Sequence, residues 1–516
     1  MTEASLPPLI QAMQKPEFYP HPVTVPVELI QTHVSYVLLT GDYVYKVKKP
    51  VNFGFLDFST LEKRQHFCQE ELRLNQRGAA ALYLEVLPIS QVDSEYQLGD
   101  EGNAVEYTVK MRQFPQDALL SSLYDRGELT EALIQQLAVK VAAFHKTTPT
   151  NDYIRGFGAV GQIRQAFDEN YEQTVGFIGG PQTQQQFDET QAYTDRFFGD
   201  RTSLFEQRVQ QDKIRECHGD LHLRNIASWN NELWLFDCIE FNEPFRFVDV
   251  MYDVAYIVMD LDIRQRPDLR ALFLNTYFEE TGDWEGLQVL PIYVNRQTYV
   301  RAKVISFLLN DAGASAAEKQ AASDTAAQYY RLAWEYTQPR KGQLVLMSGL
   351  SGSGKSTTAR ALAARTGAIH IRSDAVRKHL GGVALQERGD ASLYTPEMTQ
   401  KTYQRLLDLG VALASEGYTV ILDAKYDRQE VRQEAIIQAK NHQLPLTLLH
   451  CTAPLEVLSD RLQKRTDDIA DATVEVLAQQ YFESFLDSEQ SYVTTLESTQ
   501  DITPQLDPIV QQIQSA

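Results

Sequence analysis

The chain has 516 residues, of which 43% are hydrophobic and 23% are charged, and its formal net charge is −21. This length predicts two or three domains, and the acidic charge argues against broad surfaces for nucleic acid or for anionic lipids. No apolar run is long enough to span a membrane, the first residues lack the basic flank and long apolar core typical of a secretory signal, and the four cysteines form no CxxC pair. We therefore expect a cytoplasmic protein with reduced thiols.

The first predicted lobe is rich in β-strands and follows a Pro-rich segment at residues 1–25. Two strands, at residues 36–40 and 43–49, flank a Gly-Asp hairpin turn. Along the second strand, the side-chain period of two places Lys46 and Lys48 on the same face of the sheet. The pattern alone therefore treats the two lysines as equivalent.

A helical pattern follows at about residues 60–80, with Phe67 and Leu74 on its buried side. Glu70 and Glu71 both lie inside this pattern. Because Glu71 shares a helix face with the two apolar residues, we expect Glu71, rather than Glu70, to point toward the protein interior.

Two further strands, at residues 86–89 and 106–111, complete the predicted lobe, and residues 112–115 form a hinge. The segment 120–216 is mostly helical by the spacing of its apolar residues. His145 lies on one of these apolar helix faces and is expected to be a core histidine.

The segment from His218 to Glu240 carries the most informative polar residues. Asp220 and Asn225 are five residues apart, and Asp237 follows twelve residues later, after an apolar run. A carboxylate on a tight loop can accept the proton of a substrate hydroxyl, and an amide oxygen with a second carboxylate can hold Mg²⁺ against the phosphates of ATP. We therefore expect Asp220 to act as a base and Asn225 and Asp237 to bind the metal, while His218 stabilises the loop by hydrogen bonds.

This stretch, HGDLHLRN followed by an aspartate at the end of a short strand, resembles the aminoglycoside phosphotransferase family, relatives of the protein kinases. The resemblance implies a bilobal α+β fold and the same roles for Asp220, Asn225 and Asp237. It further implies that Asp249 is a structural acid after the metal site.

The same resemblance implies a lysine on the second strand that reaches the α- and β-phosphates of ATP. Lys46 is favoured for this role, and Lys48 is the alternative. A glutamate on the following helix is implied to pair with that lysine, and Glu71 is preferred over Glu70. No GxGxxG sequence is present to cover the phosphates, so the loop at residues 32–35 is expected to do so with small hydroxyl side chains.

Helices are expected at about residues 249–280 and 290–335. Asp249 and Asp253, four residues apart on the first of them, are expected to cap the helix or to stabilise the catalytic loop, unless Asp253 lies on a solvated helix face. Residues 336–342 break the helical pattern with a proline and a glycine, so we place a linker there.

A strand at residues 343–347 leads into the sequence GLSGSGKS and then a helix at 357–365. This is GxxxxGK[ST] in the strand–loop–helix context that a Walker A motif requires. The loop N–H groups and the helix N-terminus favour phosphate binding, Lys355 should neutralise β- and γ-phosphate oxygens, and Ser356 should bind Mg²⁺. The residues expected to contact nucleotide are Gly349, Leu350, Ser351, Gly352, Ser353, Gly354, Lys355, Ser356 and Thr357.

A second strand at residues 368–371 precedes Asp374 and Arg377, which are three residues apart at the start of a helix. A carboxylate there can take the proton of a hydroxyl group, and the arginine can hold the acceptor or a phosphate. A third strand at residues 418–422 ends at Asp423, a position where P-loop proteins usually hold Mg²⁺ through water.

A fourth strand at residues 446–450 precedes a helix at 454–465 that carries Arg461 and Arg465 on one face. These arginines are expected to close over the transferred phosphate as a lid. Alternating strands and helices predict a doubly wound parallel sheet with ligands at the carboxyl ends of its strands.

The sequences SDxxR, ILDA and RLxxR after successive strands resemble the P-loop kinases that include zeta toxins, chloramphenicol phosphotransferase, gluconate kinase and polynucleotide kinase. This resemblance implies Asp374 as base or acceptor ligand, Arg377 as acceptor ligand and the two lid arginines. P-loop kinase domains of this kind are grouped with the AAA family ATPases. The order of the two domains, kinase-like and then P-loop kinase, also resembles uncharacterised bacterial two-domain proteins.

The sequence therefore predicts an α+β bilobal protein-kinase-like domain at residues 1–335, with an N-lobe at about 25–111 and a helical C-lobe at about 115–335. After the linker at 336–342, an α/β P-loop domain with a doubly wound parallel sheet is expected at 343–516.

The predicted activity is that of an ATP-dependent phosphotransferase with two modules, each using Mg²⁺ and ATP to phosphorylate a hydroxyl of a small molecule. One alternative is a nucleotide-sensing pseudo-kinase domain fused to a working P-loop kinase, which the weakly defined phosphate loop at residues 32–35 suggests. Others are a kinase of nucleic-acid 5′ ends, against which the acidic composition argues, and a plain ATPase.

Overall fold

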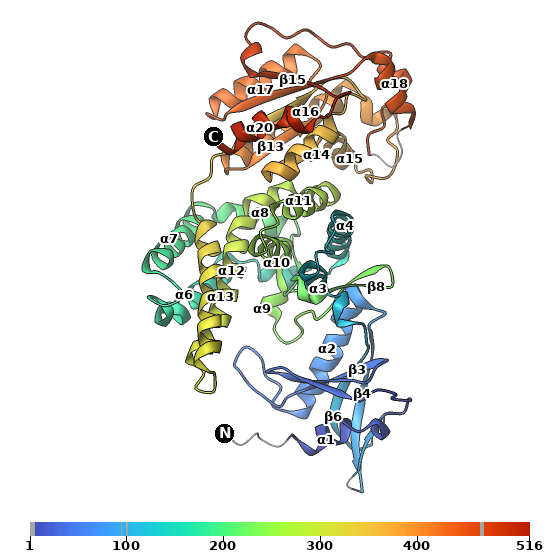
Figure 1. The fold of residues 1–516 in the computed structure, drawn as a ribbon, viewed down its shortest axis with the longest axis vertical. Helices are drawn as coiled ribbons and strands as arrows, with labels where there is room; N and C mark the ends of the chain where they lie inside the picture. Colours follow the sequence, from blue (N-terminus) through green and yellow to red (C-terminus); the bar gives the residue numbers. More distant parts are fainter. Residues whose placement is uncertain (1–5, 94, 100–101, 465–468, 516) are drawn as a thin grey trace. The chain divides into compact units, whose positions relative to one another are not determined.

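The computed structural model describes residues 6–93, 95–99, 102–464 and 469–515 (Figure 1). Packing divides the chain into two compact units. The first contains Met1–Thr130, Ala143–Glu169 and Phe198–Asp260, and the second contains Glu131–Ala142, Asn170–Phe197 and Leu261–Ala516. The linker predicted at residues 336–342 stays a prediction.

A six-stranded antiparallel sheet forms the β-rich lobe of the first unit, in the order β1-β2-β3-β6-β4-β5. Its predicted strands are confirmed, and the hairpin between β2 and β3 turns at Gly41, where φ is 96°. The strands are β1 (Glu28–Gln31), β2 (Ser35–Leu39), β3 (Tyr43–Lys48), β4 (Tyr83–Val92), β5 (Glu95–Leu98) and β6 (Ala104–Arg112).

Helix α2 (Leu61–Ala79) lies between β3 and β4 in the chain and packs on β4 and β6. The Thr60 side chain caps its N-terminus by accepting a hydrogen bond from the Lys63 N–H. Cys68 and Val109 belong to the apolar cluster between this helix and the sheet. Because α2 crosses the sheet here, its buried polar side chains face the lysines of β3.

The remainder of the first unit positions a short hairpin of β8 (Ile226–Trp229) and β9 (Glu232–Leu235). Its turn residues Asn230 and Asn231 have φ values of 55° and 61°, a left-handed conformation that asparagine tolerates better than most residues. The first unit also contains α3 (Leu120–Asp125), α5 (Asp152–Gly156), α8 (Thr202–Gln210), β7 (Ile214–Glu216), α9 (Glu243–Arg246), β10 (Phe247–Asp249) and most of α10 (Val250–Ile263).

The second unit contains a five-stranded parallel sheet in the order β12-β13-β11-β14-β15, which confirms the predicted fold class. Every residue of the central strand β11 is buried. The strands are β11 (Gln343–Ser348), β12 (Ile369–Arg372), β13 (Thr419–Asp423), β14 (Leu446–Thr452) and β15 (Val493–Glu497), and only β15 was not expected from the sequence.

Helices cover both faces of this sheet. On one face, Met347 packs with residues of α14 and α20, and on the other, α16 approaches closely enough that a Cβ at Gly410 would lie 2.8 Å from Leu422. From α11 onward, the α-helices of the second unit are α11 (Pro267–Thr281), α12 (Leu290–Ser306), α13 (Ala316–Glu335), α14 (Lys355–Thr366), α15 (Ser373–Gly381), α16 (Pro396–Ser415), α17 (Gln429–Asn441), α18 (Leu455–Lys464), α19 (Val474–Leu477) and α20 (Thr503–Ser515).

Within the described residues, no helix has the length and apolar character that crossing a lipid bilayer requires.

Candidate active sites

One carboxylate, that of Glu71, holds both lysines of β3. Its Oε1 atom lies 2.8 Å from the Lys46 Nζ atom, and its Oε2 atom lies 2.6 Å from the Lys48 Nζ atom. Burial alone would raise the pKa of the Glu71 carboxyl, but the two ammonium groups lower this pKa to about 2. Glu70 points elsewhere and pairs with Arg73 at 2.8 Å.

The two lysines differ in exposure and in their second partner. The Lys46 side chain is 17% exposed, and its Nζ atom also lies 2.7 Å from the Oδ1 atom of Asp237, whose own side chain is half-exposed. The Lys48 side chain is 1% exposed, pairs with Glu240 and lies over the Phe58 ring at 4.7 Å. Lys46 therefore faces the open site, whereas Lys48 belongs to a buried ion-pair network that the sequence pattern did not reveal.

The structure brings the three expected catalytic and metal-binding residues together at the open end of the β8–β9 hairpin. The Asn225 amide donates to the backbone oxygen of Asp220 at 2.9 Å and to its Oδ2 atom at 3.2 Å. The Phe236 N–H donates to the Asn225 carbonyl at 3.1 Å, which continues the hairpin pairing and places Asp237 beside it. Asp237 has a φ of 63°, a left-handed conformation that is uncommon for aspartate and recurs at functional sites.

This donor set fits a hard divalent cation, because carboxylate and amide oxygens are the ligands that Mg²⁺ accepts. The Asn225 amide nitrogen faces Asp220, so its Oδ1 atom is the atom able to bind a cation. The Asp220 side chain is partly exposed and also lies 3.3 Å from the His222 Nε2 atom.

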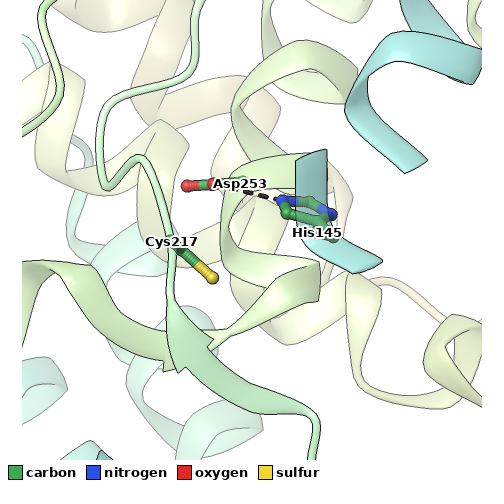
Figure 2. A group of neighbouring side chains, drawn as sticks. All are labelled: His145, Cys217 and Asp253. Atoms are coloured by element: carbon green, nitrogen blue, oxygen red, sulfur yellow. Dashed lines mark hydrogen bonds and ion pairs between the residues drawn. The ribbon is translucent and has the colours of Figure 1, made fainter. Parts of the chain in front are cut away.

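His145, Cys217 and Asp253 form a buried cluster (Figure 2), and Asp253 contacts the start of the loop that carries Asp220. The Asp253 Oδ2 atom accepts a hydrogen bond from the His218 N–H at 2.8 Å and lies 3.2 Å from the His145 Nε2 atom. Its Oδ1 atom accepts from the Gly219 N–H at 2.9 Å. Both carboxylate oxygens are thus used by hydrogen-bond donors, so we interpret the cluster as structural support for the loop rather than as a metal centre.

Burial would raise the pKa of Asp253, but the hydrogen bond to His145 and the donors of the loop lower it overall. The Asp253 side chain is fully buried, so a solvated helix face is wrong, and its hydrogen bonds from the His218 and Gly219 N–H groups are those that the expected stabilising role requires. Seven residues further along α10, Asp260 accepts a hydrogen bond from the Leu223 N–H at 2.9 Å. Asp249 pairs with Arg208 through both of its oxygens, at 2.8 and 2.7 Å.

Gly219 is required by the shape of this loop. Its φ is 87°, and a Cβ atom would lie 2.7 Å from the Phe245 carbonyl oxygen. His218 stabilises the loop as expected, because its Nε2 atom lies 2.9 Å from the Phe236 carbonyl and its Nδ1 atom accepts from the Asp220 N–H at 3.3 Å.

The second site forms around the loop between β11 and α14. Gly349 and Gly352 have φ values of 134° and 84°, and a Cβ atom on either would lie within 2.7 Å of a backbone oxygen. The Lys355 ammonium donates to the Leu350 carbonyl at 2.8 Å. The buried Ser353 hydroxyl has no hydrogen-bond partner among the described residues, which suits a loop whose partner is an anion.

Asp423, at the end of β13, lies beside this loop. Its Oδ2 atom is 3.0 Å from the His370 Nε2 atom, and both side chains are 4% exposed. Burial would raise the pKa of Asp423, but His370, Lys355 and Ser356 lower this pKa to about 2. Burial also lowers the pKa of Lys355, against the attraction of Asp423. A hydroxyl and a carboxylate beside a lysine fit Mg²⁺ bound to phosphate.

Lys355, Ser356 and Asp423 line a cavity of about 1440 Å³. Asp374 and Arg377 line the same cavity. The Arg377 guanidinium donates to the Leu393 carbonyl at 2.8 Å and lies 5.2 Å from the Tyr394 ring centroid. The structure therefore gathers Lys355, Asp374, Arg377 and Asp423 at one cavity.

Arg461 contacts the phosphate loop directly. Its guanidinium donates to the Gly352 carbonyl at 3.2 Å and to the Ser498 carbonyl at 2.7 Å. This places Arg461 as a support of the loop, and its role as a lid stays a prediction. Arg465 lies outside the described residues.

Sequence patterns missed two residues of this site. The Gln480 side chain accepts from the Ser351 N–H at 3.0 Å and donates to its hydroxyl at 2.9 Å. The sequence predicts only that His370 belongs to a strand, although a polar residue inside an apolar strand is itself a signal of a special role.

The fold and the two sites define a bilobal kinase-like domain joined to a P-loop domain on one chain. Residues 344–483 match the family model described as an AAA domain. The chain belongs to the same family as the "Uncharacterized protein Rv2004c" of Mycobacterium tuberculosis (strain ATCC 25618 / H37Rv), which is 31% identical over 464 residues, 89% of this chain and 90% of the relative.

Two solved structures are also similar. One is a choline/ethanolamine kinase family protein from Mesorhizobium loti, which is 12% identical and is aligned over 64% of this chain and 98% of its own, with a TM-score of 0.38. The other is the Mycobacterium tuberculosis APS kinase CysC, which is 18% identical and is aligned over 34% of this chain and 100% of its own, with a TM-score of 0.27.

Proposed function

We propose that this protein is an ATP-dependent phosphotransferase with two active sites, each of which transfers the γ-phosphoryl group of ATP to a hydroxyl of a small molecule. One observation carries the proposal. Each unit gathers a lysine ammonium, oxygen atoms suited to Mg²⁺ and a further carboxylate able to act as a base. Such a set supplies the positioning and charge stabilisation that phosphoryl transfer needs.

In the kinase-like site, Lys46 would bind the α- and β-phosphates, with Glu71 holding its ammonium in place. Asn225 and Asp237 would hold Mg²⁺, which supplies charge neutralisation when it is bound. Asp220 would accept the proton of the acceptor hydroxyl as its oxygen forms a bond to the γ-phosphorus and the bond to ADP breaks.

In the P-loop site, the loop N–H groups and Lys355 would bind the phosphates, and Ser356 and Asp423 would hold Mg²⁺. Asp374 would orient the acceptor hydroxyl or take its proton. Arg377 would hold the acceptor, because its guanidinium already lines the cavity and is fixed by the Leu393 carbonyl.

The test is a screen of a metabolite extract with γ-labelled ATP on the full chain and on the variants Asp220→Ala and Lys355→Ala. Each single variant should lose a different set of labelled products, and the double variant should lose both. Asp220→Ala should still bind ATP at the kinase-like site. Two surface variants, Glu232→Ala and Lys464→Ala, serve as controls and should label the full set.

Persistence of every labelled product in the double variant would refute the proposal. Loss of all products in Asp220→Ala alone would show that only the kinase-like site transfers phosphate. Release of labelled phosphate without any acceptor would instead indicate a plain ATPase.

A second candidate is that the kinase-like domain only senses nucleotide. The turn between β1 and β2 favours it, because the Thr32 hydroxyl accepts a hydrogen bond from the Ser35 N–H at 2.9 Å and the Lys49 ammonium donates to the Thr32 carbonyl at 2.7 Å. The turn thus uses several of its polar groups internally. In a Lys355→Ala background, this candidate predicts an ATP-dependent rise in melting temperature without labelled products.

A further inference from the structure

Helix α11 packs against α14 (Figure 1). It also packs against β12, the edge strand of the parallel sheet. The Asn275 side chain makes the contact specific. Its Nδ2 atom donates to the Ala368 carbonyl at 3.0 Å, and its Oδ1 atom accepts from the His370 N–H at 2.9 Å. One amide therefore satisfies two backbone groups that an additional strand would otherwise pair with.

His370 connects this contact to the P-loop site. Its backbone N–H is held by Asn275, while its imidazole lies 3.0 Å from the Asp423 carboxylate. Both side chains of the second contact are buried. The path from Asn275 to the site is therefore two hydrogen bonds long and passes through a single residue.

The C-terminal end of α11 also contacts the end of β12 and helix α15. The Glu279 carboxylate lies 3.4 Å from the Arg372 guanidinium, and the Glu279 carbonyl lies 2.7 Å from the His379 Nε2 atom. Gly282 ends the helix with a φ of 67°, and a Cβ atom there would lie 2.9 Å from the His379 ring. These contacts fix the position of α11 against β12 and α15.

We propose that Asn275 is a positioning residue of the P-loop site, which orients the Asp423 carboxylate for metal binding through His370. This inference rests on the proposed function, because that proposal makes Asp423 a holder of Mg²⁺. Partners that orient a metal ligand set its geometry, and their removal typically costs about 10- to 100-fold in metal affinity. Helix α11, which the sequence assigns to the kinase-like domain, is thus part of the second active site.

The experiment measures the Mg²⁺ dependence of binding of a fluorescent ATP analogue to the full chain. Asp237→Ala is present throughout, so that the kinase-like site does not contribute metal-dependent binding. Asn275→Ala should raise the Mg²⁺ concentration for half-maximal binding roughly tenfold, and metal-free binding should stay the same. A merely structural loosening of the unit would weaken both.

The path through His370 is tested by a double-mutant cycle. His370→Ala should also weaken Mg²⁺ dependence, and Asn275→Ala added to it should have no further effect, because the intermediary is already lost. Asn275→Asp keeps the acceptor for the His370 N–H, so it should lose less than Asn275→Ala and remains informative if the alanine variant fails to fold. Additive losses in the double variant would overturn the proposal.

Asn295→Ala is the matched control, because Asn295 is also buried in the second unit and donates to the Ala333 carbonyl at 2.8 Å. It should lower the melting temperature without changing the Mg²⁺ dependence. Failure of the proposed function would give a different result. In that case the Asp237→Ala parent would show no metal-dependent binding, or Lys355→Ala would leave that binding unchanged. Normal binding by the parent with no change in Asn275→Ala would reject the inference alone.

Discussion

The Lys46 ammonium donates a hydrogen bond to the Asp237 carboxylate at 2.7 Å, although the two residues are 191 positions apart in the chain. The contact joins the β-rich lobe to the end of the β8–β9 hairpin. When nucleotide binds, a phosphate group would become the partner of Lys46 and a metal ion the partner of Asp237. Nucleotide binding is therefore expected to separate the two side chains.

The two lysines of β3 should respond differently to substitution. In a Lys355→Ala background, Lys46→Ala should weaken ATP binding by about 2 kcal/mol, the value of a hydrogen bond to a charged group. Lys48→Ala should instead cost about 3–5 kcal/mol of unfolding free energy, because it leaves Glu71 short of one cation and Glu240 without its ammonium partner in a buried site. ATP titration and urea unfolding measure the two effects. The opposite order would show that Lys48 is the ligand-binding residue.

Glu71 should make the free energy of unfolding depend on pH in the acidic range. Its pKa is about 2 in the folded protein against an ordinary value of 4.5, so its ionised form stabilises the fold above pH 4.5. This contribution is lost as the pH falls from about 4.5 toward 2. Glu71→Gln should therefore be less stable than the wild type by about 3 kcal/mol at pH 7, and the gap should shrink below pH 4.5.

Melting temperatures of the full chain between pH 7 and pH 3 would show this convergence. Glu70→Gln is the control, since Glu70 forms a more exposed pair with Arg73 and such pairs contribute little. A gap between Glu71→Gln and the wild type that stays constant with pH would contradict the assignment.

Asp253 should stabilise the loop that carries Asp220 through its hydrogen bonds to that loop. Asp253→Asn places an amide NH₂ group among donors, so we expect a loss of about 3 kcal/mol of unfolding free energy and a loss of transfer at the kinase-like site. Urea unfolding and product labelling measure the two. Cys217→Ser should change stability far less. If a chelator destabilised the wild type but not Cys217→Ser, the cluster in Figure 2 would be a metal centre instead.

Arg461 should support the phosphate loop of the second site. Arg461→Ala removes donors to the Gly352 and Ser498 carbonyls, and we expect nucleotide affinity to fall about tenfold in an Asp237→Ala background. Lys464→Ala, on the same helix but exposed and paired with Asp460, should bind as the parent does. Equal losses in both variants would point to α18 as a whole rather than to this contact.

Local patterns were sufficient where a residue's role depends on its own segment. The GLSGSGKS loop follows a strand and starts a helix, and its glycines adopt the conformations that the pattern requires. The period of two in β3 correctly placed Lys46 and Lys48 on one face. The same pattern could not separate them, because only the packing of α2 and Phe58 decides which lysine is buried.

Residues that act over long sequence distances could not be found from local patterns. Asn275 lies 95 positions before His370, and its role depends on the side of the sheet against which α11 packs. Gln480 meets Ser351 across 129 positions by means of a segment without a repeating pattern. The fold class can be predicted from the periodicity of each segment. Which side chains contact each other depends on how distant segments pack, and no single segment contains that information.

The contact of Asn275 with β12 has a practical consequence for dissecting this protein. A fragment that begins at Gln343, where the sequence places the second domain, would leave the outer side of β12 open, with the Ala368 carbonyl and His370 N–H facing solvent. Open strand edges pair readily with those of other molecules. Such a fragment would be prone to self-association, and one that begins before Pro267 would retain its natural protection.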